Sequence, residues 1–350
     1  MNQFWRYSPI IFGIVCLLAG CKQQVHPVVR PAFYHWKTTF DPAPEARQLV
    51  QNMETERIYL HLFDIDWDEG LKAPAPIAYL EPRQPLDVFK VEWVPTVFIT
   101  NRSLTRLPIQ SAADFAERLT GKVLEQIEAL KLQRVPEVQL DCDWTQSTRD
   151  VYFEILKTCR AELSKAGINL SATIRLHQLR YPEQTGVPPA DRGMLMYYNM
   201  GEVRHWEEPN SILNLAAAAP YLQTKSYALP LDLALPVFQW GVLFREGEMI
   251  RLLSGLSAND LSDPERFYDM KGGRYEVVQG TFLQGHYLYE GDLIRLETVN
   301  QEALHIAVDQ LRGFDWAGDV FLTFYELDSA PELGLDAAAL DAVIKAFEGE

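Results

Sequence analysis

The sequence predicts a (β/α)8 barrel with a small α+β insertion after the seventh strand. Eight short segments rich in apolar, β-branched and aromatic residues are predicted to be strands, and amphipathic segments of helical period alternate with them. Short strand-like pieces separated by glycines follow the seventh strand, which places the insertion at about residues 245–300. A doubly wound open sheet is the main alternative, because strand–helix alternation alone does not distinguish the two topologies.

Turn and cap signals bound the elements in the first half of the chain. The turn Asp41-Pro42-Ala43-Pro44 follows the first strand, Ser111 precedes the long helix after the third strand, and Gly167 ends the helix after the fourth. The predicted elements are a strand at 28–36, a helix at 45–53, strands at 57–65 and 92–99, a helix at 111–131, a strand at 137–144, a helix at 147–166 and a strand at 168–176.

The second half shows the same alternation until the insertion interrupts it. Gly272-Gly273, Gly285 and Gly291 divide the insertion into short pieces. The predicted elements are a sixth strand at 193–199, a helix at 211–222, a long seventh strand at 229–244, strand-like pieces at 275–282 and 286–296, a helix at 302–312, an eighth strand at 319–327 and a closing helix at 335–347.

The N-terminus has the features of a bacterial lipoprotein signal peptide at residues 1–20. Arg6 precedes the apolar run 9–18, which is shorter than the roughly 20 apolar residues that span a bilayer. The small residues before Cys21 resemble a lipobox, and they also fit an ordinary signal peptide followed by an incidental cysteine. We expect lipid on Cys21 and therefore a membrane as one partner.

The expected anchor defines the rest of the domain organisation. A tether at 21–30 leads into the barrel domain at 31–350. The residue after the lipidated cysteine is Lys22 rather than aspartate, which favours the outer membrane of the bacterial envelope over the inner one.

Composition narrows the classes of partner and chemistry. A net charge of −16 without a basic block argues against a nucleic-acid partner. The sequence has no Gly-rich dinucleotide fingerprint, phosphate loop, His-Glu-x-x-His or Cys-x-x-Cys motif, so we expect neither a cofactor nor a metal. Cys142 and Cys159 remain in the mature domain, and we expect two buried thiols, with a single bridge as the alternative.

Acidic residues at the end of the fourth strand are the first candidates for a catalytic site. Function in such barrels sits where strands end and βα loops begin. The strand period of two puts Asp141 and Asp143 on one face, with Cys142 on the other. Two close carboxylates raise one another's pKa, which lets one act as a general acid. The alternative is a structural pair held by Arg149 or Arg175.

Other strand ends supply further candidate site residues. Asp64 and Asp66 end the second strand, where acidic residues often only cap the next helix. Glu326 ends the eighth strand and is a third candidate acid. Flat amphipathic rings stack on sugars, so the aromatic residues near strand ends are candidate binding residues, although most aromatic side chains in a large domain are core. The residues predicted to bind substrate are Trp36, Asp64, Asp66, Trp144, Tyr198, Asn199 and Trp240.

Several of these segments, in the same order, resemble the chitinase-like family 18 glycoside hydrolases. Leu140-Asp141-Cys142-Asp143-Trp144 is similar to the end of that family's fourth-strand signature, Asp-x-x-Asp-x-Asp-x-Glu. Met196-Tyr197-Tyr198-Asn199 is similar to its Met-x-Tyr-Asp on the sixth strand. Leu233-Ala234-Leu235-Pro236-Val237-Phe238 resembles its seventh strand, and 318–324 falls where its last strand does. The resemblance covers most of the mature chain and implies a barrel that acts on or binds a carbohydrate.

The departures from the family pattern concern its catalytic acid. The family's proton-donating glutamate aligns with Thr145, and its first aspartate aligns with Val138. Threonine has no carboxyl proton to give, so the substrate-assisted mechanism that the resemblance implies does not run unchanged. Two hypotheses follow. Either Asp143, Asp141 or Glu326 supplies the acid of an envelope glycosidase, or the barrel is a non-catalytic glycan-binding or structural lipoprotein.

Overall fold

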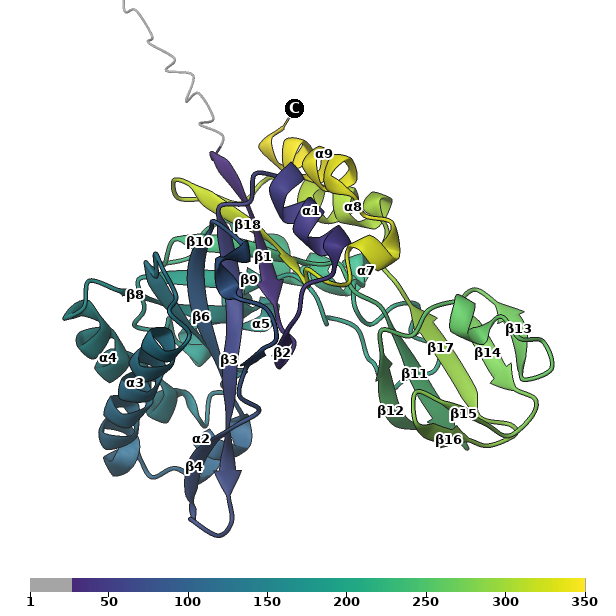
Figure 1. Ribbon diagram of the computed structural model, residues 1–350, viewed down its shortest axis with the longest axis horizontal. Coiled ribbons are helices and arrows are strands. Elements are labelled where there is room, and N and C mark those ends of the chain that lie inside the picture. Colours follow the sequence, from purple (N-terminus) through teal and green to yellow (C-terminus); the bar gives the residue numbers. More distant parts are fainter. Residues whose placement is uncertain (1–26, 350) are drawn as a thin grey trace, which may run out of the picture.

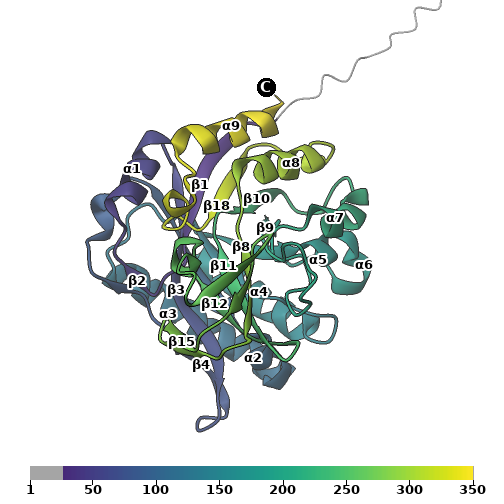
Figure 2. The ribbon, with the colours of Figure 1, turned by 90° about the vertical axis from the view of Figure 1, so that its right-hand side faces the viewer.

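The computed structural model describes residues 27–349, in which eight parallel strands form a closed barrel (Figures 1 and 2). The first strand pairs in parallel with both the last strand and the second barrel strand, which closes the sheet and rules out the open alternative. The barrel strands are β1 (Val29–His35), β3 (Arg57–Asp68), β6 (Glu92–Ile99), β7 (Glu137–Asp141), β8 (Asn169–Arg175), β9 (Arg192–Met196), β10 (Leu231–Pro236) and β18 (Val320–Tyr325). The predicted (β/α)8 fold is confirmed.

Helices cover the outside of the barrel unevenly. The two long helices α3 and α4 pack side by side, and α4 buries one face through Tyr152, Ile155, Cys159 and Leu163, at helical spacing. The helices are α1 (Pro44–Asn52), α2 (Asn101–Arg106), α3 (Ala112–Ala129), α4 (Arg149–Ser164), α5 (Leu176–Arg180), α6 (Pro182–Thr185), α7 (Leu215–Ala218), α8 (Gln301–Leu311) and α9 (Ala337–Glu348).

The helix predicted at 211–222 is mostly wrong, for a local reason. The side chain of Asn210 accepts hydrogen bonds from the backbone N–H groups of Ile212 and Leu213, which holds this segment in a turn. The side chain of Asn214 then caps α7, so the helix begins only at Leu215. Pro220 has no N–H to continue an α-helix, and the chain finishes as the 3-10 turn Ala219–Gln223.

The long strand predicted at 229–244 is two strands in different sheets. Barrel strand β10 ends at Pro236, and the next N–H, that of Val237, donates to the carbonyl of Tyr325 at 2.6 Å. The chain then turns, and β11 (Trp240–Arg245) begins the insertion. The apolar sequence is continuous across the break, so periodicity carried no signal for it.

The insertion is a second antiparallel sheet that projects from the barrel (Figure 1). Residues 240–297 contain the 3-10 turn Asn259–Leu261 and no α-helix, so the insertion is a β-structure rather than the α+β unit predicted. It has a small core of its own, separate from that of the barrel. Its strands are β11, β12 (Glu248–Ser254), β13 (Phe267–Lys271), β14 (Arg274–Val277) and β17 (Leu293–Glu297), with the hairpin β15 (Thr281–Leu283) and β16 (His286–Leu288).

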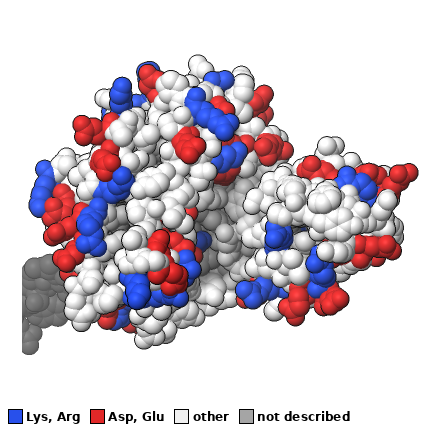
Figure 3. Space-filling view, turned by 60° about the horizontal axis from the view of Figure 1, so that its bottom comes forward, with Lys and Arg blue, Asp and Glu red and all other residues white. Residues whose placement is uncertain are grey.

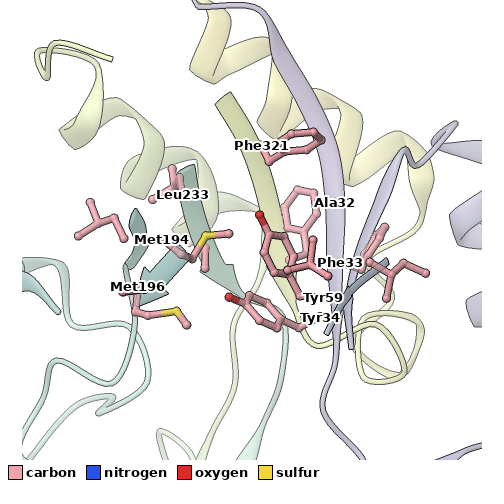
Figure 4. Packing of buried hydrophobic residues seen from close by; sticks show 14 of the residues in the cluster. Ala32, Phe33, Tyr34, Tyr59, Met194, Met196, Leu233 and Phe321 are labelled. Atoms are coloured by element: carbon pink, nitrogen blue, oxygen red, sulfur yellow. The ribbon is translucent and has the colours of Figure 1, made fainter. Parts of the chain in front are cut away.

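The barrel interior is filled by side chains rather than open. Figure 4 shows Tyr34 and Tyr59 pointing toward Met194 and Met196 of β9. The Tyr34 hydroxyl donates to Oε1 of Gln139 at 2.5 Å, so the one polar atom of this ring is paired inside the core. Such a packed interior leaves the ends of the barrel as the places for binding.

Three short strands lie at the edges of the barrel. β3 runs past its barrel partners and pairs with the antiparallel strand β4 (Ala73–Ile77), which makes a projecting hairpin. Strands β2 (Thr39–Phe40) and β5 (Glu81–Pro82) pair with each other.

Cys142 and Cys159 are buried thiols that are not bonded to each other. The predicted signal peptide and Cys21 lie outside the described residues. Within residues 27–349, no helix has the length and apolar character needed to span a bilayer.

A buried ion pair holds the insertion against the loop that follows β9. Arg295 and Glu297 of β17 are both almost fully buried and pair at 2.6 Å. The Arg295 guanidinium donates to the carbonyls of Val203, at 3.0 Å, and His205 in that loop. The Glu297 carboxylate accepts from the Ser211 hydroxyl and from the Trp240 indole N–H, each at 2.6 Å. The pair therefore fixes Trp240 where the insertion meets the barrel.

Candidate functional site

Two adjoining cavities lie over the carboxyl ends of the barrel strands. One has a volume of about 490 Å³ and the other about 570 Å³, and Asn199 lines both. The space-filling view in Figure 3 shows the hollow between the barrel and the insertion. Asn199 follows β9 with a φ of 54°, a conformation that asparagine adopts more readily than most residues, and its N–H donates to the carbonyl of Ile212 at 2.7 Å.

The first cavity, here called the aromatic cavity, has rings along its walls. Trp36 from the end of β1 lies 5.7 Å from Tyr325, measured between ring centroids. Phe238 lies 5.6 Å from Tyr325 and 5.3 Å from Trp240. Trp36 and Trp240, both predicted to bind substrate, thus lie at one cavity although they are about 200 residues apart in sequence. Lys37 and Glu326 are its charged groups, with Glu332 at the rim.

The second cavity, here called the polar cavity, is built around an ion pair. Arg175, at the end of β8, donates from Nε and Nη2 to the two carboxylate oxygens of Asp143, the second contact at 3.3 Å. The same guanidinium lies 5.7 Å from the ring centroid of Tyr198. Tyr198 stacks on Tyr325 at 5.2 Å, so one pair of rings connects the two cavities.

Asp141 is the last residue of β7, whereas Asp143 lies beyond the strand, and the two carboxyl groups occupy different environments. Asp143 lines the polar cavity with its side chain half exposed. Asp141 is only 7% exposed and accepts a hydrogen bond from the Thr173 hydroxyl at 2.7 Å. Burial raises the pKa of Asp141 to about 6; the charge of Asp143 adds to this rise, and that of Arg175 opposes it. Of the two arginines considered from sequence, Arg175 is the partner, while Arg149 pairs with Asp150.

The acidic cluster of Asp64 and Asp66 lies on the part of β3 that pairs with β4 in the projecting hairpin. Asp66 accepts hydrogen bonds from Arg102 and from the Thr100 hydroxyl, and Thr100 is the N-cap of α2. The Arg102 contact lowers the pKa of Asp66. Asp64 contacts Nε2 of His61 at 2.8 Å. Thr100 rather than Asp66 caps α2, and both carboxylates are engaged by side chains of the protein itself.

Trp144 corrects a prediction. Its ring is fully buried, stacked on Tyr152 at 5.3 Å, and its indole N–H donates to the carbonyl of Thr185 at 2.9 Å. A ring enclosed on both faces has no surface for stacking on a sugar. Period-two alternation assigned Trp144 to a strand, but β7 ends at Asp141, so the pattern no longer applied there.

Glu326 is a carboxyl group placed in the aromatic cavity. Its Oε1 accepts from the Ser329 hydroxyl at 3.1 Å. Burial raises the pKa of Glu326, and the positive charge of Lys37 opposes this rise. A partly buried acid with a raised pKa, beside stacked rings, has the properties of a general acid.

Sequence reasoning missed some cavity residues. Lys37 follows Trp36 at a strand end, and His177 lies in the first turn of α5, directly after β8. Barrel sites are built from such positions, so position alone could have indicated both residues. Burial lowers the pKa of His177, against the charge of Asp143. Phe238 gave no signal within its apolar run. In residues 27–349 no group of three or more potential ligands is placed to hold a metal ion.

Solved structures with this barrel fold include a spore cortex-lytic enzyme and several chitinases. The spore cortex-lytic enzyme of Bacillus megaterium QM B1551 is 11% identical with a TM-score of 0.55, over 91% of this chain and 74% of that one. A chitinase from Chromobacterium violaceum is 13% identical with a TM-score of 0.52, over 93% and 99% of the two chains. The fold is that of a chitinase-like barrel.

A third structure of the same chitinase-like fold contains a ligand. The second catalytic domain of the Group II chitinase from Ostrinia furnacalis, in complex with an N-acetylchitooligosaccharide, is 9% identical with a TM-score of 0.52, over 92% of this chain and 97% of that one. No family model and no curated protein matches the sequence. The resemblance to these hydrolases is therefore confirmed at the level of the fold.

The buried Asp141 predicts how stability depends on pH. The pKa of Asp141 is higher in the folded protein than the ordinary 3.8, so the protonated carboxyl favours the folded state. This contribution to the unfolding free energy is complete below about pH 4 and is lost as the pH rises to about 6. The asparagine side chain stays neutral at every pH. The unfolding free energy of Asp141→Asn, minus that of the unsubstituted protein, should therefore rise by on the order of 2 kcal/mol from pH 4 to pH 8. Urea unfolding at a series of pH values measures this.

The matched variant is Thr173→Val, which removes the hydroxyl that donates to Asp141. Loss of this donor should move the fall in stability to higher pH. If plots of unfolding free energy against pH are parallel for the unsubstituted protein and Asp141→Asn, the pKa of Asp141 is not raised in the folded protein.

Proposed function

We propose that this chain binds an oligo- or polysaccharide across the mouth of its barrel. The observation that carries the proposal is the junction of the aromatic and polar cavities at Asn199. Sugar rings have apolar faces that stack on aromatic side chains and hydroxyls that need hydrogen-bond partners. The aromatic cavity offers the first through Trp36 and Trp240, and the polar cavity offers the second through Asp143 and Arg175.

Non-catalytic binding is the function that these contacts support best. Both carboxylate oxygens of Asp143 accept hydrogen bonds from Arg175. A proton on either oxygen would break one of these two hydrogen bonds, so the arrangement favours the ionised carboxylate. Asp141 lies buried beneath the mouth. Thr145, where the resembling family has its acid, contacts the hydroxyl of Ser147 at 2.9 Å. None of these three positions presents an acid to a bound sugar.

Hydrolysis is the second candidate, and the observation that favours it is Glu326. Its carboxyl lines the aromatic cavity with a raised pKa. In that case Glu326 gives its proton to the leaving oxygen of a glycosidic bond held against Trp36 and Trp240 as the bond from the anomeric carbon to that oxygen breaks. A water molecule then adds to the anomeric carbon and returns a proton to Glu326.

We also propose that the chain is anchored in the bacterial envelope by lipid on Cys21. The sequence before Cys21 supports an anchor, and Lys22 favours the outer membrane. β1 enters the barrel at the end opposite the cavities, close to α9 (Figure 1). A tether that leads into β1 would leave the cavities facing away from the membrane, toward polymeric glycan in the surrounding space.

Removing the Trp36 ring tests glycan binding. Trp36→Ala should weaken binding of chitooligosaccharides or cell-wall glycan fragments about tenfold, because the stacking surface of the aromatic cavity is lost. Titration calorimetry measures the change. Trp316→Ala is the matched control, since Trp316 is a partly buried tryptophan that packs on Phe347 of α9. No binding by the unsubstituted protein across such a panel would overturn the proposal.

Glu326→Gln tests hydrolysis. If the barrel cleaves glycans, this change should lower the release of new reducing ends by about 100-fold or more, since it removes the acid. Glu332→Gln is the control, because Glu332 is an exposed acid at the rim of the same cavity. Loss of release in Asp143→Asn, with Glu326→Gln active, would assign the acid to Asp143 instead. Absence of release with binding intact would leave the non-catalytic function alone.

Cys21→Ser tests the anchor. The unsubstituted chain should sediment with envelope membranes and incorporate radiolabelled palmitate in a bacterial host, and the variant should do neither, because serine has no thiol to lipidate. Equal membrane association of the two proteins would contradict anchoring through Cys21.

A further inference from the structure

The insertion has a strip of three aromatic rings that are largely exposed to solvent. Phe282 of β15 and Tyr287 of β16 are direct cross-strand partners, and their ring centroids lie 5.1 Å apart. Tyr289 follows at 5.0 Å from Tyr287. The three side chains are 67%, 46% and 54% exposed. We call Phe282, Tyr287 and Tyr289 the aromatic strip.

The opposite face of the hairpin explains why the three rings point outward. Leu283 and Leu288 are buried in the insertion's own core. Strand alternation then sends Phe282 and Tyr287 to the solvent side. The hydroxyl of Tyr287 lies over Gly280, where a Cβ would come within 2.4 Å of it. A glycine here gives the ring room to lie close to the backbone.

Polar contacts hold the strip in place. Arg266 donates to the Thr281 hydroxyl and to the carbonyl of Phe282, each at 2.8 Å. The buried Asp292 carboxylate accepts from the N–H of Tyr289 at 2.8 Å, and from Arg245. The Arg245 guanidinium in turn lies 4.3 Å from the Tyr289 ring centroid. These contacts fix the backbone that carries the strip, and Arg245 also fixes the Tyr289 ring, so less conformational entropy is lost when a ligand stacks there.

The strip continues from the aromatic cavity. Gln284, at the turn of the hairpin, donates to the carbonyl of Ser254 at 3.1 Å, and Ser254 lines that cavity. The far end of the strip, Tyr289, contacts Arg245 at the end of β11, whose first residue is Trp240. The six extended residues of β11, from Trp240 to Arg245, span roughly 17–20 Å, which is the distance from the cavity to the far end of the strip. The strip therefore runs outward along the insertion from the cavity at Trp240, and Figure 1 shows the hairpin beside β12.

We propose that the aromatic strip is a second carbohydrate-binding surface, on which a polymeric glycan lies after it leaves the aromatic cavity. This inference rests on the proposed glycan binding at the barrel mouth. The strip presents a few hundred Å² at most, less than the roughly 800 Å² that each partner buries in a typical protein complex. The net charge of −16 opposes adsorption to anionic lipid. A glycan chain needs only a narrow row of rings.

The experiment compares a polymer with a short oligosaccharide. Insoluble chitin and purified bacterial sacculi are the polymers, assayed by co-sedimentation, and chitotetraose is the short probe, assayed by calorimetry. The double variant Phe282→Ala/Tyr287→Ala should bind the polymers about tenfold more weakly and chitotetraose with unchanged affinity, because only a long chain reaches the strip. Phe282→Trp, which keeps a stacking ring, should retain polymer binding.

Tyr268→Ala is the matched control, since Tyr268 is 60% exposed on β13, at the other edge of the insertion's sheet. It should bind both probes as the unsubstituted protein does. Polymer binding that is equal in the double variant and the unsubstituted protein would overturn the aromatic strip while leaving binding at the mouth intact. Failure of the unsubstituted protein to bind any of the three probes would overturn the proposed function, and the strip with it.

Discussion

The buried pair of Arg295 and Glu297 is the interaction that holds the insertion against the barrel. It joins β17 of the insertion to the loop after β9 and holds the indole of Trp240. Two charges taken out of water are tolerated only where every remaining donor and acceptor is paired. The carbonyls of Val203 and His205, the Ser211 hydroxyl and the Trp240 N–H supply those partners. One satisfied network thus fixes the angle of the insertion and one wall of the aromatic cavity.

The centre of the mouth is organised by stacking as much as by charge. Tyr198 stacks on Tyr325 and lies under Arg175, and Arg175 holds Asp143. A carboxylate held by a guanidinium is a good acceptor for sugar hydroxyls. It is poorly arranged to give up a proton. Glu326, whose pKa burial raises, lies instead in the aromatic cavity.

This chain is similar to the neighbouring structures in its fold, and a shared fold does not by itself imply a shared chemistry. The neighbouring structures cover more than nine tenths of it at 9–13% identity, which reflects the packing constraints of an eight-stranded barrel. Function in such folds depends on the side chains at the strand ends. Here those positions carry Thr145 and a buried Asp141, and beside them lie two adjoining cavities whose rings come from distant strands.

The sequence was enough to predict eight strands alternating with helices and to place Asp143, Tyr198 and Glu326 near strand ends, because period-two and helical patterns are local. Closure of the sheet into a barrel became certain only from the pairing of β1 with both β18 and β3. Four features followed from tertiary contacts instead: β10 stops at Pro236, Trp144 is enclosed, Arg102 holds Asp66, and Trp36 and Trp240 share a cavity. These features depend on contacts between residues far apart in the chain, including the contacts that determine which aromatic rings are buried by other segments. No local pattern encodes that information.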